Sequence, residues 1–117
     1  MTDQLVYEVH DKIATIRLNR PEKYNAFTSE MLKAWASALE ESQARDDVNV
    51  VILTGTGKGF CSGGDVENMK NRTEDSAYSR KLFLSEQVHQ IPLTLERMDK
   101  PVIVAVNGAA TGAGMDM

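Results

Sequence analysis

Residues 48–64 read VNVVILTGTGKGFCSGG, a nearly continuous apolar run that passes directly into a glycine-rich stretch. A short run rich in β-branched residues is typical of a strand that is covered on both faces. Residues 102–106, VIVAV, have the same character and also pass into small residues. We therefore predict two buried strands, Val48–Leu53 and Val102–Val106, each followed by a glycine-rich loop at its carboxyl end.

The sequence before residue 48 changes from a strand period to a helix period. Leu5–Val9 and Ile13–Leu18 are short, rich in β-branched residues and separated by Asp11-Lys12, which predicts a β-hairpin. Beyond it, one apolar stripe at helical spacing predicts a helix from about Ser29 to Ala44, with Thr28 or Ser29 as its N-cap. The residues expected to face inward are Leu32, Trp35 and Leu39.

The rest of the chain adds helical segments and a second loop. A helical stretch is predicted to begin near Thr73, and Pro92 suits the first turn of another short helix that ends by Lys100. Asn107 starts a loop of small residues, and Gly112 marks the entry to a further helix. A strand, a helix and a strand in succession imply a right-handed crossover. The order ββαβαβ therefore predicts an α/β fold, with residues 1–117 in a single domain.

Composition argues against several classes of function. The chain has 117 residues, a net charge of −4 and no run of Lys and Arg, which argues against a nucleic-acid surface. No apolar run reaches the roughly 18 residues of a membrane span, and the N-terminus lacks a signal-peptide pattern. We therefore expect a cytoplasmic protein without membrane contact. Cys61 has no disulfide partner, and neither His10 nor His89 has a metal-ligand partner at suitable spacing, so we expect no metal.

The two glycine-rich loops are the candidate functional segments. In open α/β architectures ligands bind beyond the carboxyl ends of the strands, where both loops are expected to lie. Glycine lets a ligand approach the main chain, so two backbone N–H groups could bind one oxygen atom there. Nucleotide motifs fit poorly, because Phe60 stands where G-x-G-x-x-G needs glycine and no Gly-Lys-Ser/Thr closes the loop. A plain flexible connection between strand and helix is the alternative.

Three segments of the chain resemble the motifs of one known family. Residues 18–26, LNRPEKYNA, resemble L-N-R-P-x-x-x-N-A, and residues 59–66, GFCSGGDV, resemble F-x-x-G-x-D followed by a hydrophobic residue. Residues 100–108, KPVIVAVNG, resemble K-P-V-I-A-A-V-N-G. The family with these motifs is the crotonase superfamily, the enoyl-CoA hydratase/isomerase family. The motifs occur in the family's order and together extend over nearly the whole chain. The resemblance implies a crotonase-like β/α spiral and acyl-CoA chemistry of the kind used in fatty acid metabolism.

The resemblance also implies a mechanism. A thioester carbonyl gathers negative charge when its α-carbon is attacked or deprotonated, and two backbone N–H groups form an oxyanion hole for it. By motif position these donors are the N–H groups of Gly64 and Ala113, and Ala113 lies at a predicted helix start that favours an anion. Asp116 falls where hydratases of the family carry a catalytic Glu, or it is an acidic residue favoured in a first helical turn. Asp is one methylene shorter than Glu, so isomerisation or another acyl-CoA reaction stays open beside hydration.

The same motifs place the coenzyme A part of the substrate. Lys23 is one of the residues expected to contact it, but it is equally well explained as a solvated turn residue. We interpret Cys61 as a small wall residue and not as a nucleophile, because the sequence places no base beside it. The resemblance implies no permanently bound cofactor, since coenzyme A enters as part of the acyl-CoA substrate. The residues expected to contact it are Glu22, Lys23, Tyr24, Ala26, Ser62, Gly63 and Asp65.

Family members are about twice as long as this chain, so we expect residues 1–117 to be the N-terminal half, truncated inside the active-site motif. The complete protein is then expected to form a homotrimer or a dimer of trimers. Residues 1–117 alone are expected to be inactive and to leave apolar strand faces open. The alternative is that these residues are the whole product, a non-catalytic remnant that binds coenzyme A or associates with a partner.

Overall fold

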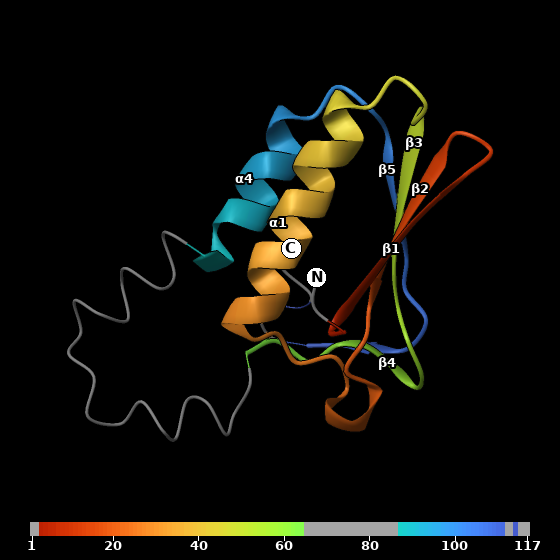
Figure 1. Ribbon diagram of the computed structural model, residues 1–117. Coiled ribbons are helices and arrows are strands. Elements are labelled where there is room, and N and C mark those ends of the chain that lie inside the picture. Colours follow the sequence, from red (N-terminus) through yellow and green to blue (C-terminus); the bar gives the residue numbers. More distant parts are fainter. Residues whose placement is uncertain (1–2, 65–86, 112–113, 115–117) are drawn as a thin grey trace.

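The computed structural model describes residues 3–64, 87–111 and 114 (Figure 1). Its elements confirm the α/β class, and the two strands of the hairpin come first, as predicted. In chain order the described elements are β1 (Leu5–His10), β2 (Ile13–Leu18), the 3-10 turn η1 (Pro21–Lys23), α1 (Ser29–Ala44), β3 (Val50–Gly55), β4 (Gly59–Cys61), α4 (Gln90–Arg97), β5 (Val102–Ala105) and β6 (Ala109–Ala110).

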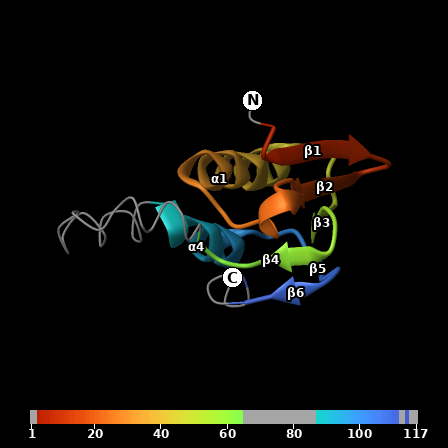
Figure 2. The same cartoon turned by 90° about the horizontal axis from the view of Figure 1, so that it is seen from below.

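The described strands form two sheets. Four of them lie in the order β1-β2-β3-β5, with β1 antiparallel to β2 and the other neighbours parallel. The register pairs Ile13 with Val50 and Val51 with Val102, so β2, β3 and β5 begin at one edge of the sheet and end at the other. Strands β4 and β6 form a second, two-stranded parallel sheet near the carboxyl ends of β3 and β5 (Figure 2).

The hairpin turn follows from two residues with left-handed backbone conformation. Asp11 has φ 51° and Lys12 has φ 67°. A two-residue turn of this kind has the twist that joins two antiparallel strands without splaying them. Asp is among the non-glycine residues that tolerate such a conformation, and Lys12 adopts it at the cost of some strain. The predicted hairpin is confirmed, and β1 extends one residue further than expected, to His10.

Helix α1 covers one face of the larger sheet and supplies more residues of the buried core than any other element. Thr28 is the N-cap: its Oγ1 accepts a hydrogen bond from the N–H of Met31 at 3.1 Å, which satisfies one of the free donors of the first turn. Trp35 and Leu39 are fully buried and Leu32 nearly so, as predicted. They pack with Ile16, Leu18 and Val51 of the sheet in the buried cluster. The predicted helix over residues 29–44 is confirmed.

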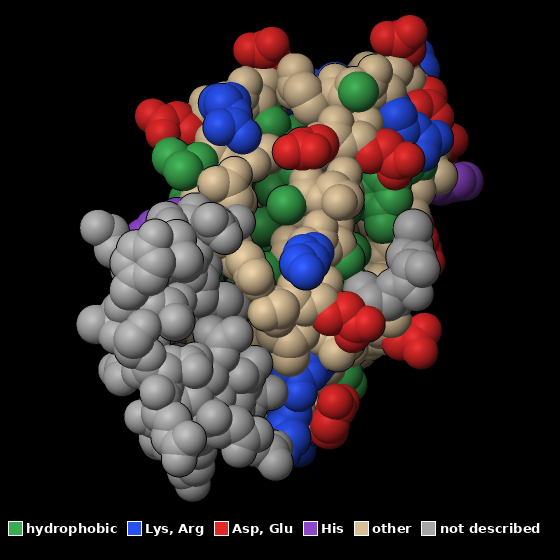
Figure 3. Space-filling model, turned by 60° about the vertical axis from the view of Figure 1, so that its left-hand side comes forward, with side chains coloured by type: hydrophobic (Ala, Val, Ile, Leu, Met, Phe, Trp, Pro, Cys, Tyr) green, Lys and Arg blue, Asp and Glu red, His purple; other side chains and the backbone are tan. Residues whose placement is uncertain are grey.

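Helix α4 lies beside α1 on the same side of the sheet (Figures 1 and 2). Pro92 lies in its first turn, as predicted, where the missing N–H of proline removes no helical hydrogen bond. Ile91 is fully buried and Val88 is nearly so, which ties this helix to the core. The start predicted near Thr73 for the preceding helical stretch lies outside the described residues. On the face shown in Figure 3, the acidic and basic side chains of the described residues are interspersed.

The prediction that the two apolar strands are covered on both faces is wrong for the described residues. In β3, Val51 and Leu53 face the core, whereas Val50 and Ile52 on the other face are partly exposed. In and after β5, exposure is 55% for Ile103, 43% for Val104 and 58% for Val106. The physical reason is the place of each strand in the sheet. Strand β5 is at one edge, whereas α1 packs on β1 and β2 toward the other edge. The expected open apolar strand face is therefore present.

Both ends of β3 and the end of β5 also differ from those predicted, and β3 ends at Gly55, two residues later than expected. Strand β3 begins at Val50 because Val48, although buried, lies in the turn after α1, where its N–H reaches the carbonyl of Arg45 at 3.4 Å. Strand β5 ends at Ala105, one residue early. No helix in the described ranges 3–64 and 87–111 is long and apolar enough to cross a membrane.

Candidate active site

The two glycine-rich loops lie against each other, as their places after β3 and β5 predict. Within them, β4 and β6 pair in parallel, with Gly59 opposite Ala109 and Cys61 opposite Ala110 (Figure 2). The N–H of Thr111 continues this pairing by donating to the carbonyl of Cys61 at 3.1 Å. These short strands were missed from the sequence because two or three residues are too few to show a period. The interpretation as a plain flexible connection is wrong for residues 59–61, which are paired and buried.

Glycines let the two main chains touch. A Cβ added at Gly108 would lie 1.8 Å from the carbonyl oxygen of Lys58, and one at Gly114 would lie 2.2 Å from that of Cys61. Real Cβ atoms are not found so close to backbone atoms, so any side chain at these positions would push the loops apart. The close approach of the two loops therefore depends on residues that have no side chain.

The segment before α1 forms a tight turn that leans on the first loop. After the 3-10 turn, Tyr24 and Asn25 both have left-handed backbone conformation, with φ 51° and 57°. The Arg20 guanidinium closes the turn, because its Nη1 donates to the carbonyl of Ala26 at 2.7 Å. The Arg20 carbonyl accepts hydrogen bonds from the N–H groups of Lys23 and Asn25, each at 2.9 Å. This network fixes the main chain over residues 20–26.

Most of the residues expected to contact coenzyme A are brought together by this turn. The N–H of Ser62 donates to the carbonyl of Tyr24 at 3.1 Å, and the N–H of Phe27 donates to the carbonyl of Gly63 at 2.8 Å. The side chains of Glu22, Lys23 and Tyr24 are exposed beside this junction, Tyr24 at 55%. Ser62 is also exposed, and its hydroxyl donates to the carbonyl of Lys23 at 3.4 Å.

Ala26 differs from its neighbours in that turn. It is 6% exposed, and both of its main-chain groups are already bonded within the chain. Its N–H donates to the carbonyl of Lys23 at 3.1 Å, and its carbonyl accepts from Arg20. Ala26 therefore supports the turn, and a ligand has little access to it. Asp65, the remaining residue expected at this surface, lies outside the described residues.

Gly64 lies at the end of the first loop, where the chain passes beside the residue before α1. It pairs with Phe27 in an isolated parallel bridge, and Gly63, which precedes it, has φ 95°, a conformation that favours glycine. Within the described part of the chain, no residue accepts a hydrogen bond from the Gly64 N–H. Gly64 itself is partly exposed. Ala113 and Asp116, the other two catalytic candidates, lie outside the described residues.

Two asparagines that the sequence analysis did not single out hold the first loop in place. Asn25, fully buried, donates through Nδ2 to the carbonyls of Thr56 at 3.0 Å and Gly59 at 2.8 Å. Asn107 donates through Nδ2 to the carbonyls of Gly57 at 2.9 Å and Gly59 at 3.1 Å. Both asparagines stand in the motifs quoted above, which was the available signal.

Cys61 fits the interpretation as a wall residue. Its side chain is fully buried between the loops and the core, and this burial raises the pKa of the thiol, so the thiol stays protonated and unreactive at neutral pH. In the described ranges, no three His, Cys, Asp or Glu side chains are grouped closely enough to hold a metal ion.

The fold and these loops agree with comparisons to known proteins. The model of the enoyl-CoA hydratase/isomerase family matches residues 8–117. The chain therefore belongs to this family, as the three sequence motifs indicated. A solved Pseudomonas aeruginosa protein superposes with a TM-score of 0.87 at 35% identity, over 99% of this chain and 50% of that one. An enoyl-CoA hydratase from Mycobacterium marinum gives a TM-score of 0.79 at 32% identity, over 95% and 51%.

Curated relatives include enzymes with different reactions. The chain is 35% identical over 116 residues to 1,2-epoxyphenylacetyl-CoA isomerase from Escherichia coli (strain K12), covering 97% of this chain and 44% of the relative. It is 34% identical over 107 residues to 4-chlorobenzoyl coenzyme A dehalogenase-2 from Arthrobacter sp, covering 92% and 39%. The chain thus spans less than half the length of these relatives.

Proposed function

We propose that the protein carrying this chain acts on acyl-CoA thioesters and holds the thioester oxygen with the N–H groups of Gly64 and Ala113. The observation that carries the proposal is that the Gly64 N–H has no acceptor among the described residues, at the end of a loop packed directly on the second glycine-rich loop. The named relatives support the substrate class: the isomerase and the dehalogenase act on different acyl groups, and both names specify a coenzyme A thioester.

Two fixed N–H groups suit a reaction in which negative charge develops on one oxygen. When a thioester loses an α-proton, or when a nucleophile adds to the conjugated carbon, charge moves onto the carbonyl oxygen. Main-chain donors that are already in place stabilise this charge without having to reorient. Loss of one such donor raises the barrier by about 3–4 kcal/mol in other enzymes. Asp116 would deliver or accept the proton, in an isomerisation or a hydration.

The exposed surface of the turn and the first loop is proposed to bind the coenzyme A portion. Lys23 offers a positive charge for phosphate, and the exposed Tyr24 ring offers an apolar face for the base. Glu22, Ser62, Gly63 and Asp65 would complete this surface. Coenzyme A would enter only as part of the substrate, with no permanently bound cofactor, and the complete protein would be a homotrimer or a dimer of trimers.

The test compares two substitutions at Gly64 in the protein produced from its natural gene. Gly64→Pro removes the N–H, whereas Gly64→Ala adds a Cβ and keeps the N–H, so the difference between them isolates the donor. With a short enoyl-CoA such as crotonyl-CoA, followed by loss of the conjugated thioester absorbance, we expect Gly64→Pro to turn over about a hundredfold more slowly than Gly64→Ala. Equal turnover in the two folded variants would refute the assignment of Gly64. Wild-type protein that binds coenzyme A without turning over any acyl-CoA would instead favour the non-catalytic remnant.

A further inference from the structure

The carbonyl oxygen of Gly59 accepts hydrogen bonds from two side-chain amides that come from distant parts of the chain. Asn25 Nδ2 lies 2.8 Å from it and Asn107 Nδ2 lies 3.1 Å from it. Asn25 belongs to the turn before α1, and Asn107 to the loop after β5. The three sequence motifs of the chain therefore meet at one oxygen atom, at the first residue of β4.

The two amides bind four polar main-chain groups of the tight turn that links β3 to β4. Asn25 also binds the carbonyl of Thr56 at 3.0 Å, and Asn107 also binds the carbonyl of Gly57 at 2.9 Å. The Asn107 Oδ1 in turn accepts the N–H of Gly55 at 3.1 Å. Residues 55–59 include three glycines, one of which, Gly57, has φ 85°, so this segment has many alternative conformations, and these hydrogen bonds select one.

Both amides are themselves anchored. The Oδ1 of the buried Asn25 accepts the N–H of Arg20 at 2.8 Å, so all the hydrogen-bonding groups of that amide are used. Asn107 is followed by Gly108, whose main chain touches that of Lys58. A displacement of the loop after β5 would therefore move residues 55–59 with it.

We infer that Asn25 and Asn107 are positioning residues, which set the place of the Gly64 N–H and its separation from the second loop; this rests on the function proposed above. The link from Gly59 to Gly64 is short and fixed at both sides. Strand β4 pairs with β6, and the N–H of Ser62 and the carbonyl of Gly63 bond to the turn before α1. Neither asparagine is required to touch the substrate.

The primary test is Asn107→Asp in the protein produced from its natural gene. This change keeps the acceptor oxygen for Gly55 and replaces the donor with a carboxylate oxygen that repels the carbonyls of Gly57 and Gly59. Asn107 is exposed, so the variant is expected to fold. The matched control is Asn19→Asp, because the Asn19 Nδ2 also donates to a main-chain carbonyl, that of Asp3 at 2.9 Å, which lies in the segment before β1.

The expected result is a loss in turnover without a loss in substrate binding. A small misplacement of a catalytic group lowers turnover by up to about a hundredfold, so we expect kcat for crotonyl-CoA to fall about ten- to a hundredfold in Asn107→Asp. KM and the affinity for free coenzyme A should change little, whereas acetoacetyl-CoA, whose enolate carries the oxyanion, should bind less tightly. Asn19→Asp should match wild type in all of these.

A second measurement separates the inference from the proposed function. Hydrogen–deuterium exchange over residues 55–64, followed by mass spectrometry, should increase in Asn107→Asp and stay unchanged in Asn19→Asp. Wild-type protein without turnover would overturn the proposed function, and exchange alone would then decide whether Asn107 holds the loop. Unchanged exchange, or wild-type kcat in Asn107→Asp, would overturn the inference. The buried Asn25→Ser is the second variant, and its loss in kcat combined with that of Asn107→Asp should be less than additive, because both act on Gly59.

Discussion

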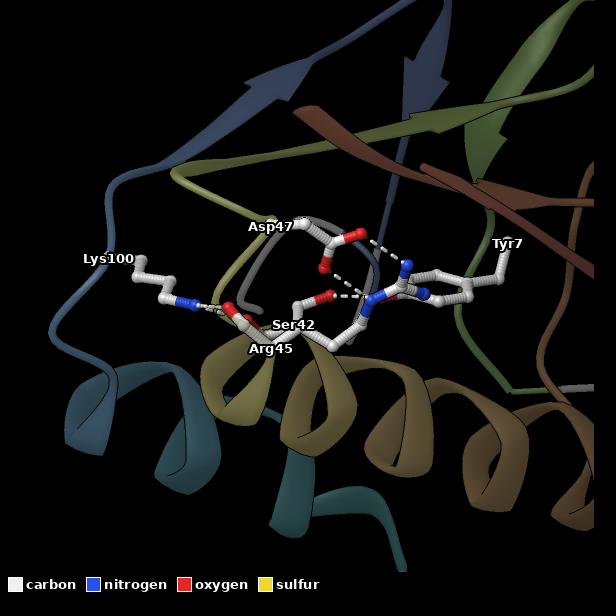
Figure 4. Close-up of polar contacts among 5 residues, drawn as sticks. All are labelled: Tyr7, Ser42, Arg45, Asp47 and Lys100. Atoms are coloured by element: carbon white, nitrogen blue, oxygen red, sulfur yellow. Dashed lines mark hydrogen bonds and ion pairs between the residues drawn. The ribbon is translucent and has the colours of Figure 1, made fainter. Parts of the chain in front are cut away.

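The two ends of the parallel strands are both held by hydrogen bonds to the main chain, but by different kinds of residue. Near the amino ends of β3 and β5, the side chains of Lys100 and Tyr7 reach the end of α1, and Arg45 pairs with Asp47 beside them (Figure 4). At the carboxyl ends, two short amides, several glycines and direct main-chain contacts hold the loops. Both ends of the strands are held by several hydrogen bonds, so the presence of such bonds does not tell which end carries a function.

The hydrogen bonds at the amino ends join the end of α1 to the sheet and to the segment before β5. The Lys100 ammonium donates to the carbonyl of Ser42 in the last turn of α1 at 2.7 Å and to that of Arg45, the C-cap of α1, at 2.5 Å. The buried Ser42 hydroxyl donates to the carbonyl of Ala38 at 2.8 Å, so at 2.9 Å from it the Tyr7 hydroxyl is the donor to Ser42 (Figure 4). A positive charge at a helix C-terminus is also favoured by the helix dipole. These bonds satisfy carbonyl groups that α1 leaves free at its end.

At the carboxyl ends the arrangement leaves a donor available. The hydrogen bonds that fix residues 55–63 are made mainly to their carbonyls, while the Gly64 N–H has no acceptor in the described ranges. Small residues there allow a ligand to approach the main chain. The two ends therefore differ in one respect that matters for binding: the carboxyl ends keep a main-chain N–H without an acceptor in the described ranges. This free donor, and not the number of hydrogen bonds, distinguishes the end that we propose binds substrate.

The largest effect that would break this comparison is expected at Gly108. In Gly108→Ala the new Cβ would lie 1.8 Å from the Lys58 carbonyl oxygen. The Cβ is attached rigidly to the main chain and the carbonyl oxygen belongs to the main chain, so neither can turn away and the loops must separate. Overpacking of this kind costs about 1–3 kcal/mol of stability, and the displaced loops should lower turnover by about a hundredfold. Denaturant unfolding and the enoyl-CoA assay measure the two effects. Ala109→Ser, which adds one heavy atom to the exposed neighbouring residue, should leave both unchanged. Full activity in Gly108→Ala would show that the spacing of the loops does not matter.

A smaller effect, of a different kind, is expected at the amino ends. Lys100→Met keeps the aliphatic stem and removes both hydrogen bonds to the end of α1. Hydrogen bonds from a charged group contribute about 1.5–3 kcal/mol, and the free energy of unfolding should fall toward the low end because Lys100 is partly exposed. The kcat of the folded protein should stay at the wild-type value. Lys33→Met removes an exposed lysine of α1 and controls for the change in net charge. A drop in kcat without loss of stability would contradict the division between the two ends.

The sequence predicted the covered half of this fold better than the loops. Helix α1 has the predicted bounds, because an apolar stripe and the capping Thr28 specify it locally. Strand β2 also has the predicted bounds. The burial of Val102–Val106 was predicted wrongly, because apolar character shows that a strand needs a cover but not which element supplies it. The role of Asn25 was missed because its acceptors Thr56 and Gly59 lie 31 and 34 residues away, and their carbonyls would be the same with any side chain. A motif can mark such a residue, but only the fold shows what it binds.

The smallest effect is expected for the exposed ion pair at the amino ends. The Arg45 guanidinium donates to the Asp47 carboxylate at 2.8 and 2.6 Å, and these hydrogen bonds hold the pKa of Asp47 below its ordinary value. A carboxyl whose pKa is lower in the folded state contributes stability that is fully present above its unfolded pKa and is lost as the pH falls through its folded pKa. Both side chains are well exposed, so water and salt screen the pair and its contribution is small. The unfolding temperature of the wild type should therefore fall between neutral and strongly acidic pH by slightly more than that of Asp47→Asn. Asp46→Asn removes the same charge one position away and should keep the wild-type pH dependence. Identical pH dependence in wild type and Asp47→Asn would show that this pair, although well formed, does not stabilise the end of α1.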